Sequence, residues 1–574
     1  MVRITNIRDA AGTMRVTSKG VNRRAVLKGA AGGAALAGAG WTGTGAAANQ
    51  ASPSASPVAS PGAATPVAGQ AVYPSGVEGV PDAYLALPEP FTSYDGVPGE
   101  GGTVRAFVIG YAPPPPPRDQ NQYWQELERR LGVTWEPIIT PQPDYGARSA
   151  TLIASGDIPE LFVINPGQNA AQQYQAMAQG AFLDLTPYVT GDALQQFTNL
   201  AAFPSYMWEN VKFQGKIFGV PKPLWRNGNL PFHRSDWAAT LGMGAPTNAQ
   251  EFHDLLVGFA TGDPDGNGSQ DTWGLGRFNG GWNVWDNLVA NPMFRVPNNW
   301  RLNVDGTLTS AIETDEFRQA VEFLTQLYTD GAYHPDAAAM TFADSQNNFI
   351  AGSTGLHYEG FLSFYGAGSV TFRAQEQNPA AMTAPIIPPG ADGGQGVTYN
   401  ETGFFGYTGI PASVGGDENR VMELLRILDY LAPPFGSEER NFLDSGIEGV
   451  HHEVDPATGA RLTNDLYGTE KGDLASVMGG QAVYFYPQAP EIALDIQRIA
   501  LEAIELGIDD PTLGLFSEAN NREGGTLAQF GQDTITAIVT GREPLDSLAT
   551  AIEEWKSRGG ETIREEYQQA LQEQ

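Results

Sequence analysis

Val104-Arg-Ala-Phe-Val-Ile109 opens the stretch that decides the fold, which runs to residue 164 as VRAFVIGYAPPPPPRDQNQYWQELERRLGVTWEPIITPQPDYGARSATLIASGDIPELFVI. Short apolar runs predict buried strands at residues 104–109, 133–139 and 161–164. Helices are expected between them, at residues 123–131 and 145–154. Strands that alternate with helices of this size indicate βαβ units and a parallel sheet. Ligands of such sheets bind beyond the carboxyl ends of the strands.

The alternation continues along the chain, which indicates an α/β fold throughout. Asp305-Gly306 lies between two short apolar segments and predicts a hairpin turn. No internal repeat interrupts the pattern. Further helices are expected at residues 248–260, 314–328, 419–431 and 544–558, and strands at 355–358 and 405–410.

The first hundred residues differ in composition from the rest of the 574-residue chain. Arg23-Arg24, an apolar Gly/Ala-rich run at 29–40 and Ala46-Ala-Ala48 predict a twin-arginine export signal over residues 1–48. The alternative, a membrane-anchor helix, is disfavoured because this run is short and rich in glycine. Residues 49–100 are interpreted as a Ser/Pro/Ala-rich linker and N-terminal extension, which serves either as a tether or as a spacer at the cleavage site. The protein is therefore expected outside the cytoplasm, in the periplasm or at the cell surface.

Charge and cysteine content exclude several classes of partner. The chain carries a net charge of −32, and the residues after position 48 are more acidic still. Such a body repels nucleic acid and anionic lipid. Because the chain contains no cysteine, the stability of its fold depends on the hydrophobic core and not on disulfides. The chain also lacks the cysteine that bacterial lipoproteins acylate.

Seven blocks, in register over about residues 101 to 570, resemble the extracellular solute-binding proteins of carbohydrate ABC transporters, in particular the large oligosaccharide- and alginate-binding group. The blocks are Ala154–Glu160, Gly180–Tyr188, Gly215–Pro221, His233–Trp237, Asp263–Leu275, Gly446–His451 and Trp555–Tyr567.

The resemblance implies a two-lobed α/β periplasmic-binding-protein fold, type II-like, over residues 101–574, with a hinge and a ligand cleft between the lobes. Lobe 1 would take about residues 101–220 and lobe 2 about 221–380, each with later segments. The implied function is capture of a carbohydrate, an oligosaccharide by the length of the chain, through hinge closure. The implied partners are the permease subunits of an ABC importer, and the protein is expected to be a monomeric binding protein and not an enzyme.

Aromatic residues near the expected cleft are the candidates for ligand binding. Aromatic planes cover the apolar C–H faces of sugar rings, while polar neighbours hold the hydroxyl groups. For any single tryptophan, core packing is the competing interpretation. For Glu448, which precedes His451-His452, a structural or hydroxyl-binding role is expected, because adjacent strand residues point to opposite faces and cannot share a metal. The candidates are Trp225, Arg226, Trp282, Trp285, Tyr358, Glu359 and Glu448.

A calcium loop is expected between residues 263 and 271. Oxygen-bearing side chains recur there at every second position, with Gly268 at the turn, as in an EF-hand. The EF-hand pattern fails at its last position, where Gly274 stands. The resembling alginate-binding proteins have a shortened loop whose last ligands adjoin, and this chain has Asp271-Thr272 there. A turn without metal is the alternative; the expected structural Ca²⁺ ligands are Asp263, Asp265, Asn267, Ser269 and Asp271.

Two other classes of function compete with that of a binding protein. An exported polysaccharide-active enzyme needs two carboxylates at a defined separation, and no pattern marks such a pair among the 65 acidic residues. A structural or adhesion protein is disfavoured because repeats are lacking. The acidic body also disfavours a uronate ligand, unless Arg226, Arg277 or Arg295 supplies local positive charge.

Overall fold

The computed structural model describes residues 72–165, 170–277, 289–365, 369–456, 459–486 and 490–573. The predicted export signal, most of the Ser/Pro/Ala tract, Trp282 and Trp285 lie outside these residues. No described helix combines the length and the apolar character that crossing a bilayer requires.

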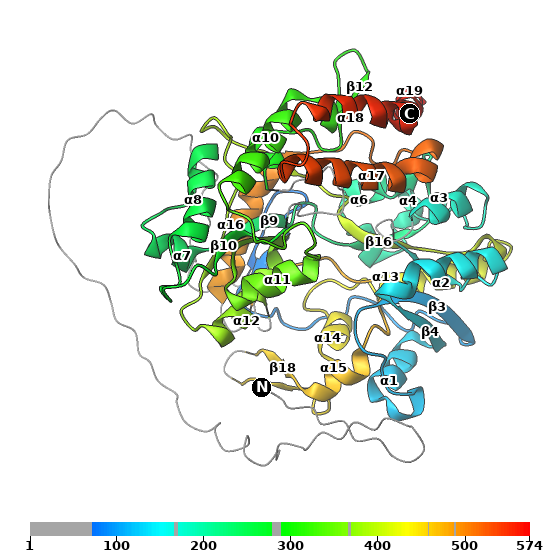
Figure 1. Ribbon diagram of the computed structural model, residues 1–574. Helices are drawn as coiled ribbons and strands as arrows, with labels where there is room; N and C mark the ends of the chain where they lie inside the picture. Colours follow the sequence, from blue (N-terminus) through cyan, green and yellow to red (C-terminus); the bar gives the residue numbers. More distant parts are fainter. Residues whose placement is uncertain are drawn as a thin grey trace, which may run out of the picture. The chain divides into compact units, whose positions relative to one another are not determined.

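The first sheet has five strands in the order β4-β3-β5-β16-β8. Strands β3, β4 and β16 of this sheet are labelled in Figure 1. The predicted βαβ pattern is confirmed, since β3 pairs in parallel with both β4 and β5. Strand β16 enters antiparallel between β5 and β8. The bounds are β3 Thr103–Gly110, α1 Gln122–Leu131, β4 Thr134–Pro141, α2 Gln142–Ser155, β5 Leu161–Ile164, β8 Val220–Pro223 and β16 Phe404–Gly409.

The second sheet has four strands in the order β10-β13-β9-β14. Strand β9 runs antiparallel to β13, and its first residue, Asn229, pairs with the last residue of β13, Gly360. The predicted hairpin is also present, with Gly306 at φ 83° between β11 and β12. The bounds are β9 Asn229–Arg234, α8 Ala249–Thr261, β10 Trp273–Leu275, β11 Trp300–Leu302, β12 Leu308–Ser310, α10 Asp315–Thr329, β13 Thr354–Gly360 and β14 Thr383–Pro385.

Each sheet has its own hydrophobic core. One core gathers buried residues between 104 and 220 with others between 404 and 478. A second gathers residues between 237 and 386 with the C-terminal helices. The chain passes from one sheet to the other at residues 224–228, after β8, and returns at 400–403, before β16. Two sheets with separate cores and repeated crossings form the two-lobed α/β fold that the resemblance implied.

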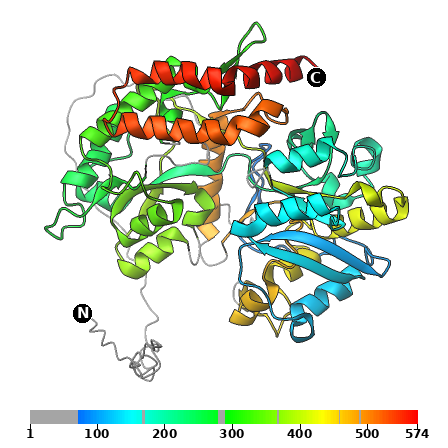
Figure 2. The same ribbon diagram turned by 45° about the vertical axis from the view of Figure 1, so that its right-hand side comes forward.

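Helices cover both sheets, and the C-terminal ones lie together (Figure 2). The expected helix at 544–558 ends its regular part at Trp555, because Gly559 at φ 134° kinks the chain before α19. The other bounds used below are α3 Ala170–Ala178, α11 Phe342–Ala351, α12 Val370–Gln377, β15 Thr398–Tyr399, α13 Glu418–Tyr430, α14 Glu438–Ser445, β17 His452–Val454, α15 Asp465–Lys471, β19 Tyr484–Phe485, α16 Pro490–Glu505, β20 Gly507–Ile508, α17 Glu518–Val539, α18 Ser547–Trp555 and α19 Glu561–Gln572.

The extension before residue 101 packs against the body. Strands β1 (Val72–Tyr73) and β2 (Ala83–Tyr84) pair with each other, and β2 pairs with β19. A third core joins Tyr73 and Ala83 to residues of α16 and β9. The packed body therefore includes residues 72–100, upstream of the start expected at residue 101.

Candidate ligand-binding site

The first sheet presents aromatic and charged side chains at the edge where its parallel strands end. Tyr111 follows β3 directly, and its side chain is 62% exposed. Because β16 is antiparallel, its start lies at the same edge, and Phe405 there meets Tyr111 edge-on at 6.1 Å between ring centroids. Lys222 of β8 places its Nζ 5.2 Å from the Phe405 ring. We call Tyr111, Lys222, Phe405 and Asp473 the first edge.

The loop after α15 holds this edge in place. The carboxylate of Asp473 accepts hydrogen bonds from the backbone N–H groups of Tyr111 and Ala112, both at 2.8 Å. Lys222 Nζ donates to the carbonyl oxygen of Ser476 at 2.9 Å. Burial lowers the pKa of Lys222 to about 8, although the negative charge of Asp473 opposes the shift. The exposed Tyr111 ring is therefore anchored through its backbone while its face stays open.

The second sheet presents a tryptophan at the matching edge, where β13 ends and β9 begins. The indole of Trp225 lies against the backbone of Gly228, where a Cβ atom would come within 1.7 Å of Trp225 Cδ1. A Cβ atom at Gly360 would lie 3.5 Å from Trp225 Cζ2. Glycine at residue 228 is thus required for this position of the ring, because any side chain there would displace it.

Polar groups surround Trp225. The side-chain amide of Asn229 donates to the carboxylate of Glu401, and the hydroxyl of Tyr358 donates to the carbonyl of Asn229 at 3.3 Å. Burial raises the pKa of Glu401 to about 6, although the hydrogen bond from Asn229 opposes the shift. We call Trp225, Asn229, Tyr358, Gly360 and Glu401 the second edge.

Both crossing segments take part in this edge and are tied to each other. The backbone N–H of Glu401 donates to the carbonyl of Arg226 at 2.7 Å. The buried Asn227 donates from Nδ2 to Thr398 Oγ1 at 2.7 Å. A ligand that contacts Trp225 or Glu401 therefore contacts segments that join the two sheets.

Three predicted site residues have other surroundings. Arg226 forms an ion pair with Asp509 at 2.8 Å, and its guanidinium lies 5.0 Å from the Tyr206 ring. Glu359 turns toward α11 and accepts a hydrogen bond from Gln346 at 2.8 Å. Burial raises the pKa of Glu359, but hydrogen bonds led by that of His357 outweigh this effect, so the pKa is lowered. Glu448 is exposed in the turn before β17, beside Arg461, and belongs to neither edge.

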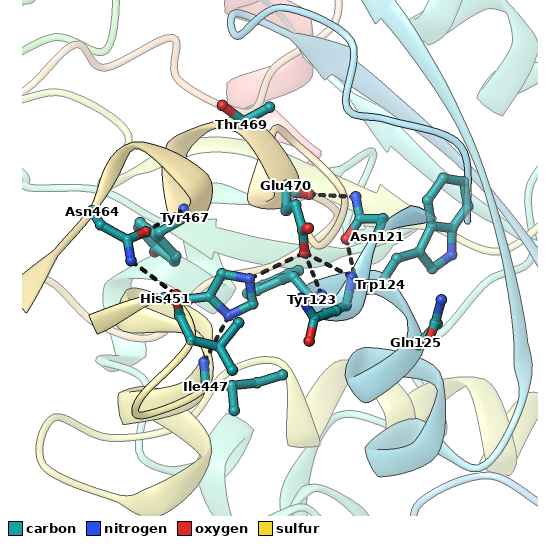
Figure 3. A network of polar contacts seen from close by, with 12 residues as sticks. Asn121, Tyr123, Trp124, Gln125, Ile447, His451, Asn464, Tyr467, Thr469 and Glu470 are labelled. Atoms are coloured by element: carbon teal, nitrogen blue, oxygen red, sulfur yellow. Dashed lines mark hydrogen bonds and ion pairs between the residues drawn. The ribbon is translucent and has the colours of Figure 1, made fainter. Parts of the chain in front are cut away.

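The two histidines after Glu448 have separate partners. Figure 3 shows those of His451. His451 is fully buried, accepts a hydrogen bond from the backbone N–H of Ile447 at Nδ1, and lies 3.1 Å from Glu470 Oε2 through Nε2. His452 Nδ1 lies 2.9 Å from the carbonyl of Ser445. Glu470 also accepts from the backbone N–H groups of Gln122 and Tyr123 at the start of α1. The pair is therefore part of the packing around α1, not a shared metal site.

The expected calcium loop gathers its acidic side chains around an amide group. Asn267 Nδ2 donates to Asp265 Oδ2 at 2.8 Å and to Asp271 Oδ1 at 3.1 Å, while Asp263 accepts from the backbone of residues 267 and 268. Burial and the neighbouring carboxylates raise the pKa of Asp265. Thr272 turns into the core and donates to the carbonyl of Phe259. In the described part of the chain, no group of three or more Asp, Glu or His side chains is arranged to hold a metal ion.

Most residues of the first edge are not predicted from the sequence. Tyr111 could have been found, because it directly follows an expected strand whose end should lie at the ligand side. Lys222 and Phe405 stand within strands, and the face of the sheet to which each side chain points depends on how its strand pairs with its neighbours. The local sequence does not specify that pairing. Asp473 and Glu401 carry no local signal, because their partners Tyr111 and Asn229 are 362 and 172 residues away.

Relatives of known class match most of the chain, although no family model matches it. The chain is 24% identical over 470 residues to Lipoprotein LipO of Bacillus subtilis, covering 80% of this chain and 90% of that protein. It is 22% identical over 475 residues to the polygalacturonan/rhamnogalacturonan-binding protein YtcQ of the same species, covering 81% and 90%.

A solved structure shares the fold. The FusA substrate-binding protein of an ABC transporter from S. pneumoniae, an EF-hand mutant in complex with fructo-nystose, superposes with a TM-score of 0.58 at 15% identity, covering 82% of this chain and 99% of that one. Together with the sequence relatives, this likeness shows that the chain has the fold of solute-binding proteins of carbohydrate ABC transporters.

Proposed function

We propose that the protein captures an oligosaccharide between the first and second edges and delivers it to the permease subunits of an ABC importer. The observation that carries this proposal is the Trp225 indole, which lies on Gly228 beside the Asn229–Glu401 pair. An aromatic face with adjacent hydrogen-bonding groups suits the apolar face and the hydroxyl rim of a sugar ring. Tyr111, exposed at the first edge, offers a second such face.

Ligand binding and lobe movement are coupled in this arrangement. Trp225 and Glu401 belong to the two segments that cross between the sheets. A ligand that contacts both edges binds the closed arrangement of the lobes more tightly than the open one. The difference between these two affinities sets how far the ligand shifts the equilibrium toward the closed arrangement. The permease would then distinguish loaded from empty protein by the angle between the lobes.

Intrinsic tryptophan fluorescence, titrated with a panel of oligosaccharides, tests the proposal. We expect a saturable change with at least one of them, and chromatography of the ligand afterwards is expected to show it intact. Breakdown of the ligand would favour an exported polysaccharide-active enzyme instead. The proposal would be contradicted if no carbohydrate of the panel changed either the tryptophan fluorescence or the melting temperature of the protein.

The proposed location of the protein is outside the cytoplasm. The proposed export route is the twin-arginine route, and the proposed oligomeric state is a monomer. The support is the Arg23-Arg24 signal in residues 1–48 and the relationship to a lipoprotein. Since this chain has no cysteine, thioether-linked lipid is not available to it. The Ser/Pro/Ala tract is then either a tether behind an uncleaved export signal or the free N-terminal segment that remains after cleavage. The N-terminal sequence of the mature protein distinguishes these two alternatives.

We also propose that the loop at residues 263–271 binds a structural Ca²⁺. The supporting observation is that Asp265 and Asp271 both turn toward Asn267 Nδ2, so an amide N–H group occupies the centre of a set of hard oxygen donors. A cation would relieve the repulsion that helps to raise the pKa of Asp265. Asp263, Asp265, Asn267, Ser269 and Asp271 would supply side-chain oxygens, whereas Thr272 would not, because its hydroxyl donates to the carbonyl of Phe259.

Chelation tests the calcium proposal. If the loop binds Ca²⁺, EGTA should lower the melting temperature, because an ion held at 100 times its Kd stabilises the native state by about 2.7 kcal/mol. The Asp263→Ala/Asp265→Ala variant should melt at the lower temperature with and without EGTA. Asp254→Ala, a change at an exposed residue of α8, is the matched control and should keep the EGTA effect. An unchanged melting temperature of the unaltered protein would argue against the ion.

A further inference from the structure

We infer that the ligand is an uncharged oligosaccharide and not an oligomer of uronic acids. The inference rests on the proposed function and names the substrate class of the same site. It is carried by the charges at the two edges: the cationic side chains there are already engaged, and the carboxylates lie among the groups that would meet a sugar. The distinction matters because acidic and neutral oligosaccharides share ring faces and hydroxyl groups and differ in charge.

Arg226 has the chemistry to bind a uronate but is engaged elsewhere. A guanidinium recognises a carboxylate through two parallel N–H groups. Arg226 instead donates from Nη2 to Asp509 at 2.8 Å, and its side chain is 22% exposed. Its guanidinium also lies over Tyr206, and its backbone carbonyl receives Glu401 N–H. Arg226 therefore ties the crossing segment to Asp509, which balances its charge.

Lys222 is a cationic group of the first edge, close to Lys471, and its ammonium group too has a partner. Its Nζ donates to Ser476 O, and the nearby Asp473 balances its charge. Burial disfavours the charged ammonium form of Lys222 and lowers its pKa to about 8. This group is a weak partner for a ligand carboxylate.

Arg277 and Arg295 also have partners. Arg277 lies two residues after β10, which runs parallel to β13, so it stands at the same end of the sheet as the second edge. Arg295 forms an ion pair with Asp392 at 2.7 Å and donates from Nε to the carbonyl of Gln395. Arg277 places its guanidinium 5.9 Å from the Phe342 ring. The internal segments outside the described residues contain no lysine or arginine in their sequence, and the longest of them, residues 278–288, adds Asp286.

Each edge also contains a carboxylate. Glu401 lies beside Trp225 at the second edge, and Asp473 lies beside Tyr111 at the first. Glu401 can accept hydrogen bonds from sugar hydroxyl groups and repels a uronate, whereas the charge of Asp473 is balanced by Lys222. The body after residue 48 adds a long-range field of the same sign, since it holds 26 basic and 64 acidic residues. A neutral sugar gains the aromatic faces and the acceptors without this repulsion.

Matched ligand pairs test the inference. Binding is measured by calorimetry at pH 7.5 for uronate oligomers and for the same oligomers with methyl-esterified carboxyl groups, beside neutral hexose oligomers of equal length. We expect the neutral form of a pair, or a neutral hexose oligomer, to bind at least about 100-fold more tightly than the acidic form, with a Kd that changes little between 20 and 300 mM salt. The Glu401→Gln variant should narrow the difference between acid and ester.

The outcomes separate the inference from the function on which it rests. Tighter binding of an acidic oligomer, weakened by salt, would overturn the inference and leave carbohydrate capture in place. Equal binding of both members of a pair would also overturn it. A protein that binds no oligosaccharide, acidic or neutral, would overturn the proposed function itself.

Discussion

Replacing Trp225 with alanine is expected to raise the Kd for the oligosaccharide about 30-fold or more. The indole is held against Gly228, and an aromatic anchor that a ligand buries at the centre of an interface contributes about 2 kcal/mol or more to binding. Since 1.4 kcal/mol corresponds to about tenfold in Kd, a loss of this size is measurable by calorimetry.

Two further variants isolate the role of this ring. Trp225→Phe keeps an aromatic face and should restore part of the affinity, whereas Gly228→Ala keeps the indole but displaces it and should weaken binding nearly as much as Trp225→Ala. Phe372→Ala removes an aromatic ring that is 44% exposed on α12, away from both edges, and serves as the control. Unchanged affinity in Trp225→Ala, with an intact fold by circular dichroism, would remove Trp225 from the site.

The Glu470→Ala variant should lose about 3 to 5 kcal/mol of the free energy of unfolding. The buried carboxylate accepts from Gln122 N at 2.7 Å, from Tyr123 N at 3.0 Å and lies 3.1 Å from His451 Nε2 (Figure 3). Its removal leaves these donors without their acceptor, and each unsatisfied buried group costs about 1 to 3 kcal/mol. Urea unfolding followed by circular dichroism measures the loss.

Controls distinguish this network from a general effect of lost charge. Glu470→Gln keeps one acceptor oxygen and should lose less stability than Glu470→Ala. Glu453→Ala removes an exposed carboxylate from the neighbouring strand β17 and should change stability by less than about 0.5 kcal/mol. A loss below 1 kcal/mol in Glu470→Ala would mean that water or another side chain replaces the carboxylate.

The sequence predicts the local elements well because their signals are local. The apolar runs at residues 104–109 and 161–164 and the apolar spacing at 123–131 become β3, β5 and α1. Strand β16 was also expected, but its place between β5 and β8 was not, because it pairs with residues far away in the sequence. Order and direction in a sheet depend on such distant pairs, which periodicity does not report.

In the candidate site, too, residues with a local sequence signal are predicted, and residues placed by distant contacts are not. Trp225 and Tyr358 were expected, since each stands beside an expected strand and carries a chemistry suited to sugars. Glu359, next to Tyr358, points to α11 instead, because successive strand residues face opposite sides of a sheet. Trp282 and Trp285 lie outside the described residues and stay predictions.

The N-terminal extension has a mechanical consequence. Tension in the preceding linker enters the folded body at Val72, where β1 pairs with β2 and β2 with β19. Gln497 of α16 reinforces this point by donating to the carbonyls of Tyr73 and Pro81 at 2.8 and 3.1 Å. Pulling on the linker therefore loads this small three-stranded patch first. Under stretch, β1 and β2 would peel away before either large sheet bears the strain.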